Sequence, residues 1–96
     1  MDIENVKRLL CDNGYEDSIV LENPDFCNAI IGVSENGNVV YDYDKMVVQL
    51  MEEDKISYED AADFISYNTI NAIPYMGEKK PIIMYRIDGL EDEGNT

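Results

Sequence analysis

Carboxylates are the reactive side chains that this 96-residue chain offers in number. It carries 21 acidic side chains against 7 basic ones and has no histidine, so its formal net charge is −14. Without histidine, a serine or cysteine nucleophile lacks its usual general base. Two cysteines and no histidine also leave a four-coordinate zinc site short of ligands. We therefore expect a protein that is not an enzyme, with no catalytic residue, no metal ion and no cofactor.

Two carboxylate spacings match parts of known metal sites. Asp42-Tyr43-Asp44 could hold a divalent cation, because hard cations prefer oxygen ligands, but a strand end followed by a helix N-cap explains the same residues. A nuclease core needs an acid on one strand and Glu-x-Lys on its neighbour. Asp25 could supply the acid, and residues 53–55 or 78–80 the tripeptide. Neither tripeptide is predicted on a strand.

The acidic residues are spread along the whole chain. Residues 1–48 hold 10 acids and 3 bases, and residues 49–96 hold 11 acids and 4 bases. Such a surface repels nucleic acid and anionic membranes, so neither is expected as a direct partner. It favours a basic protein instead. The carboxylates that we predict to bind this partner lie on the outer faces of two predicted helices: Glu52, Glu53, Glu59, Asp60 and Asp63.

A second candidate contact surface is uncharged. The stretch from Tyr67 to Met76 contains no acidic or basic side chain. In so acidic a chain, such a stretch belongs either to the core or to a contact surface. Because Tyr and Met are enriched in the centres of interfaces, we predict that Tyr75 and Met76 are at least partly exposed and contact a partner or a second copy of the chain.

Hydrophobic periodicity predicts alternating helices and strands. Helices are predicted over residues 2–13 and 44–53 and from Ser57 onward, with Asp44 and Ser57 as N-caps. Strands are predicted over residues 18–21, 27–33, 39–41 and 81–87, with a hairpin turn at Asn36-Gly37 and a loop over residues 71–80.

The predicted order of elements is α-β-β-β-α-α-β, which favours a single α+β domain. We expect an antiparallel sheet with the helices packed on one face. The domain should span residues 1–87, and residues 88–96 should form an acidic, flexible tail. One core is predicted to contain Leu10, Ile31, Val40, Leu50, Ile65, Ile83 and Tyr85.

We find no signal for export in the sequence. Its first five residues, Met-Asp-Ile-Glu-Asn, lack the basic region and apolar run of a signal peptide. No stretch approaches the ~20 apolar residues that cross a bilayer. Cys11 and Cys27 are too few for a disulfide framework, so we expect free thiols and a cytoplasmic location.

Three segments carry a resemblance: Asp42 to Met46, Tyr58 to Ala61, and Phe64 to Tyr75. Together they resemble a group of small uncharacterised acidic proteins from phages and mobile elements of Gram-positive bacteria. The resemblance covers about half of the chain, roughly residues 40–85, and brings no activity or site residues with it. It implies a genetic context, because such elements often encode inhibitors of host defence, including anti-CRISPR proteins and DNA mimics.

Charge and context together predict an inhibitor that binds a basic, nucleic-acid-binding defence protein in the cytoplasm of a bacterial host. Two alternatives stay open. The protein could bind a partner through the uncharged stretch that contains Tyr75 and Met76, or form a homodimer through it. It could also sequester a small signalling ligand, for which Lys79, Lys80 and Arg86 would have to converge with tyrosines.

Overall fold

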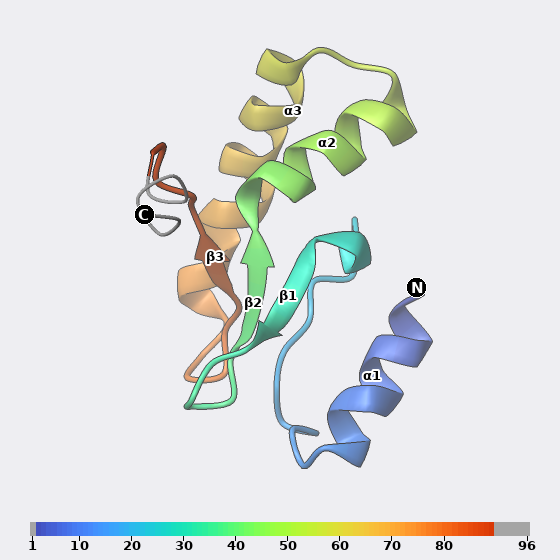
Figure 1. Ribbon diagram of the computed structural model, residues 1–96, viewed down its shortest axis with the longest axis vertical. Coiled ribbons are helices and arrows are strands. Elements are labelled where there is room, and N and C mark those ends of the chain that lie inside the picture. The colour runs from blue at the N-terminus through green and yellow to red at the C-terminus, as the bar shows by residue number, and fades with distance from the viewer. Residues whose placement is uncertain (1, 90–96) are drawn as a thin grey trace.

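Three short strands form a mixed sheet in the order β1-β2-β3 (Figure 1). In the computed structural model, which describes residues 2–89, β1 (Ile30–Val33) pairs antiparallel with β2 (Val39–Asp42). The third strand, β3 (Ile82–Met84), pairs parallel with β2. The predicted α+β class is confirmed, but the all-antiparallel sheet was wrong. Helices join β2 to β3, and a long helical connection of this kind lets the next strand run in the same direction.

The β1–β2 hairpin turns at Asn36-Gly37, as predicted. Gly37 has φ +85°, a left-handed conformation that suits glycine. Next to it, the Asn38 side chain donates hydrogen bonds of 2.8 Å to the carbonyl oxygens of both Glu78 and Lys80. The turn therefore holds the segment that leads into β3.

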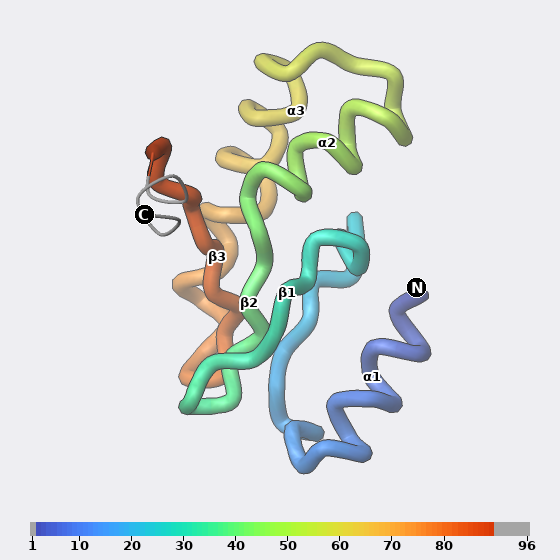
Figure 2. Tube along the Cα trace, viewed as in Figure 1, coloured from blue at the N-terminus to red at the C-terminus, as the bar shows by residue number. Residues whose placement is uncertain are grey.

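The first helix, α1 (Ile3–Asp12), matches the predicted one and lies beside β1 in Figures 1 and 2. The Asp2 side chain caps it by accepting a 2.9 Å hydrogen bond from the backbone N–H of Asn5. The strand predicted over residues 18–21 does not form. Its backbone makes single contacts instead, from Ile19 N–H to the Lys79 carbonyl at 3.2 Å and from Leu21 N–H to the Tyr41 hydroxyl at 2.9 Å.

Residues 27–33 form less strand than the sequence predicts. A 3-10 turn, η1 (Cys27–Ala29), occupies the first three positions, and β1 begins at Ile30. Likewise, the strand predicted over residues 81–87 is regular only over β3. Of the predicted tail, residues 90–96 lie outside the described part of the chain.

Two helices follow β2: α2 (Tyr43–Asp54) and α3 (Tyr58–Phe64). The N-cap of α2 is Asp42 rather than Asp44, because the strand turns directly into the helix. Ser57 caps α3 as predicted, accepting a 3.2 Å hydrogen bond from Asp60 N–H.

The chain remains helical beyond residue 70, although the sequence predicts a loop from residue 71. After α3 it continues as a π-helical turn, η2 (Ile65–Thr69), and a 3-10 turn, η3 (Ile70–Tyr75). This helical run passes behind β2 and β3 in the view of Figure 1. The predicted loop over residues 71–80 was thus wrong for residues 71–75. Buried side chains four residues apart follow one side of α3 and this run: Ala61, Ile65, Thr69 and Ile73.

The core contains some predicted residues and excludes others. Leu50 and Ile65 are buried in it, and Leu10 and Ile83 pack against it half-buried. Ile31 and Tyr85 are exposed, and Val40 is only half-buried. The fully buried apolar residues of β2 are its neighbours Val39 and Tyr41. Because strand side chains alternate between faces, this one-residue offset exchanges the predicted inner and outer faces.

We expect Leu50→Ala and Ile65→Ala each to lower the free energy of unfolding by about 2–5 kcal/mol, because each leaves a cavity in the core. Val48→Ala is the matched control, since Val48 lies on the same helix as Leu50 but is 50% exposed. It should change stability by less than about 0.5 kcal/mol. Urea unfolding of the three variants measures this, and equal effects at positions 48 and 50 would contradict the assigned face of α2.

Candidate functional site: an acidic hairpin and its uncharged extension

The helices α2 and α3 with their connection form what we call the acidic hairpin, residues 43–64. It contains the five predicted partner-binding carboxylates and lies at the top of Figure 1. Two lysines, Lys45 and Lys55, are its basic residues, and both are exposed. No ion pair between described residues neutralises its carboxylates. All seven of them are exposed: Asp44, Glu52, Glu53, Asp54, Glu59, Asp60 and Asp63.

Three of these carboxylates stand at the carboxyl end of α2, a position that a helix disfavours for acids. Glu52, Glu53 and Asp54 fill the last turn, which contains no base. Partial negative charge accumulates at this end of a helix, so acidic side chains there lower its stability. The Gln49 side chain donates hydrogen bonds of 3.2 and 3.3 Å to the two carboxylate oxygens of Glu53. Stability alone does not account for this concentration of acids.

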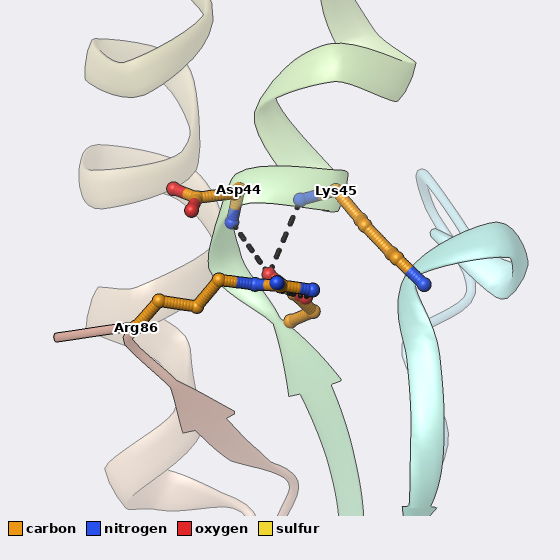
Figure 3. A network of polar contacts seen from close by, with 4 residues as sticks. Asp44, Lys45 and Arg86 are labelled. Atoms are coloured by element: carbon orange, nitrogen blue, oxygen red, sulfur yellow. Dashed lines mark hydrogen bonds and ion pairs between the residues drawn. The ribbon is translucent and has the colours of Figure 1, made fainter. Parts of the chain in front are cut away.

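An ion pair that was not predicted from the sequence joins the acidic hairpin to the sheet. Asp42 is completely buried, and its Oδ2 accepts hydrogen bonds from Arg86 Nε at 3.0 Å and Nη2 at 2.6 Å. Its Oδ1 accepts from the backbone N–H groups of Asp44 at 3.0 Å and Lys45 at 3.4 Å (Figure 3). One carboxylate therefore joins the end of β2, the start of α2 and the segment after β3.

The pKa of Asp42 reports the balance of these contacts. Burial by itself would raise this pKa, but the hydrogen bonds and charge of Arg86, with the N–H groups of Lys45 and Asp44, hold it below the ordinary 3.8. The carboxylate is thus ionised at neutral pH. Because Asp42 is already fully bonded, it is a poor metal ligand. Figure 3 shows Asp44 pointing the other way from Lys45, toward the helical run that contains α3.

The run beyond α3 is the uncharged extension, residues 65–76. Two of its tyrosines project into solvent, with Tyr67 73% and Tyr75 89% exposed. Met76 is half-buried and packs against the core, so it is much less exposed than Tyr75, the other residue of the predicted contact pair. Tyr67 was not singled out from the sequence. Its helical position, opposite the buried stripe, is the signal that could have found it.

The other constellations considered from the sequence do not assemble. Asp25 accepts a 3.1 Å hydrogen bond from Cys27 N–H within its own turn, while Glu53 ends a helix and Glu78 precedes β3. Within residues 2–89, no three acidic or cysteine side chains converge on a possible metal position. Lys79 donates to the Asn36 carbonyl oxygen at one end of β3, and Arg86 is bound at the other, so a basic ligand pocket does not form from them.

Both cysteines are free. Cys11 is exposed on α1, whereas Cys27 is buried in η1. Burial, followed by the charge of Asp25, raises the pKa of the Cys27 thiol to about 11. A thiol with such a pKa is un-ionised at neutral pH, which makes it a poor nucleophile.

Comparison of the chain with protein-family models, with curated proteins and with solved structures finds no match. No helix in the described part of the chain combines the length and the apolar character needed to cross a bilayer.

We expect Asp42→Asn to lower the free energy of unfolding at pH 7 by about 1–2 kcal/mol, because the hydrogen bonds to the charged carboxylate are lost. The loss is no larger because Arg86 is partly exposed to solvent, which screens the ion pair. The pKa of Asp42 is depressed in the folded state, so its contribution is present above the unfolded pKa and is lost as pH falls through the folded pKa. The difference between the two proteins should therefore shrink below about pH 4.

Urea unfolding of both proteins from pH 7 to pH 3 measures this difference. Asp44→Asn is the matched control, since Asp44 is the neighbouring acid and is exposed. A stability difference for Asp42→Asn that is independent of pH would show that the ion pair does not carry the effect.

Proposed function

We propose that this protein binds a basic, nucleic-acid-handling protein of a bacterial host through its acidic hairpin and blocks the site where that protein holds nucleic acid. The observation that carries the proposal is the set of seven exposed carboxylates on the hairpin, none of them in an ion pair between described residues. A basic partner would relieve the mutual repulsion of these groups. The proposed action takes place in the host cytoplasm.

The size of the molecule is compatible with imitation of DNA. Its longest extent is 38 Å, and duplex DNA carries one charge per ~1.7 Å, or about 22 charges over that length. The net charge of −14 is of the same order. The resemblance of residues 40–85 to proteins of mobile elements supports the same proposal, because such elements often encode inhibitors of host defence, including DNA mimics.

We expect the double charge reversal Glu59→Lys with Asp63→Lys to slow association with such a partner by tenfold or more, and to change its dissociation less. Long-range attraction between opposite charges acts mainly on the association rate. A partner is captured from host lysate at low salt, identified and purified. Its binding kinetics are then measured by surface plasmon resonance with each variant.

Glu16→Lys with Asp17→Lys is the control, because it changes the net charge equally at two exposed positions outside the hairpin. Equal slowing by both double variants would mean that net charge, not the hairpin, drives binding. The proposal fails for a partner whose affinity is constant from about 50 to about 500 mM salt. It also fails for a partner that binds this protein and nucleic acid together.

A second candidate is a contact through the uncharged extension, favoured by the solvent exposure of Tyr67 and Tyr75. We expect Tyr67→Ser with Tyr75→Ser to raise the dissociation rate of a partner, or of a homodimer, at least tenfold while the melting temperature stays within a few degrees. Exposed aromatic side chains are frequent binding hot spots. Surface plasmon resonance measures the dissociation rate, and calorimetry measures the melting temperature.

Met76→Ser is the contrasting variant. Because Met76 packs against the core, it should lower the melting temperature by several degrees. Unchanged self-association and partner binding in the double tyrosine variant would remove this candidate.

A further inference from the structure

The sheet ends in an open edge at β3, and we call residues 79–88 the β3 edge. The order β1-β2-β3 leaves no described strand on the outer side of β3. Between described residues, the backbone of Ile82, Ile83 and Met84 forms no hydrogen bond outside its pairing with β2. A strand can form hydrogen bonds along both of its sides, so the outer N–H and C=O groups of β3 are available to a further strand.

Large apolar side chains are exposed along this edge. Ile82 is 39% exposed, and Tyr85 and Ile87, which follow β3, are more exposed still. Natural edge strands are commonly protected from pairing by a charge within the strand, but residues 81–85 contain no charged side chain. Such an edge is a template for pairing with a strand of another chain.

The distribution of charge indicates which chain this is. Residues 79–87 contain three of the seven basic residues and no acidic one. Two copies of a chain with a net charge of −14 repel each other, so they can associate most readily where the contact contains few carboxylates. The β3 edge has this property together with unpaired backbone groups and exposed apolar area.

The two ends of the β3 edge carry opposite charges. Lys80 precedes the strand and Asp88 follows it, and both are exposed. Neither forms an ion pair between described residues, whereas Arg86 is bound to Asp42. When two identical strands pair antiparallel, the beginning of each lies beside the end of the other. Lys80 of each copy would then lie near Asp88 of the other copy, and the contact gains two pairs of opposite charge.

We propose that two copies of this chain pair through their β3 edges, antiparallel about a two-fold axis, and join their three-stranded sheets into one. The same patch of each copy meets itself, which is the commonest arrangement in symmetric dimers. The inference is independent of the proposed function, because the contact includes no residue of the acidic hairpin.

Sedimentation equilibrium of the full chain, over protein concentrations up to the millimolar range, gives the dissociation constant of the dimer. We expect Ile82→Lys to raise this constant at least tenfold, because a charge on each of the paired strands opposes pairing. Ile31→Lys is the matched control. It places the same charge on β1, the other outer strand, at a position that is 46% exposed, and it should leave the dimer intact.

Lys80→Glu should also weaken the dimer, because it brings two carboxylates together at each end of the contact. Adding Asp88→Lys to this variant should restore the dimer, since the pairs of opposite charge form again with their partners exchanged. These two variants provide the test if thermal unfolding shows that Ile82→Lys is not folded.

Three results would overturn the inference: a monomer at every concentration, a dimer that survives both Ile82→Lys and Lys80→Glu, or a dimer that Ile31→Lys weakens equally. Dissociation of the dimer by Tyr67→Ser with Tyr75→Ser would overturn it as well, and would assign self-association to the uncharged extension.

Discussion

The contact on which the rest of the structure depends is the one between buried Asp42 and Arg86, which are 44 residues apart. In the parallel register Asp42 lies opposite Met84, and Arg86 follows two residues later, on the same side of the extended chain. One carboxylate oxygen holds Arg86, and the other holds the first N–H groups of α2. The pair thus sets both the place where β3 ends and the direction in which α2 leaves the sheet. The position of the carboxylates on the acidic hairpin therefore depends on the Asp42–Arg86 pair.

Features set by neighbouring residues could be predicted from the sequence. The extent of α1, the Asn36-Gly37 turn and the Ser57 cap depend on side chains within a few positions of one another. The direction of β3 also had a signal, because helices separate it from β2, and such connections favour parallel pairing. Residues 18–21 had the apolar, β-branched composition of a strand, but they pair with no strand of the sheet. Their hydrogen bonds go to Lys79 and the Tyr41 hydroxyl instead.

The features of the candidate site also divide into those that local sequence predicts and those that depend on distant residues. That Glu52, Glu59 and Asp63 are exposed follows from helical spacing, which the sequence displays. The Asp42–Arg86 pair and the meeting of Tyr43 with Tyr85 depend on the pairing of β2 with β3, which no local pattern reveals. Met76 shows a limit of the local pattern. It is partly exposed, as expected beside Pro74 and Gly77, but it also packs against the core, because the 3-10 turn η3 extends the helical run to Tyr75.

The two candidate surfaces need not compete, because α3 of the acidic hairpin continues without a break into the uncharged extension. Asp60 and Tyr67 are seven residues apart, about 10 Å along a helix axis, so one partner can contact both. Charge at the start of the run would govern how fast such a partner arrives, and exposed tyrosines further along would govern how long it stays. In the proposed complex, this division would account for the acids on the hairpin and their absence from the uncharged extension. A carboxylate beside Tyr67 would add little to long-range attraction. It would have to lose its water in the contact, and this desolvation would make the complex less stable.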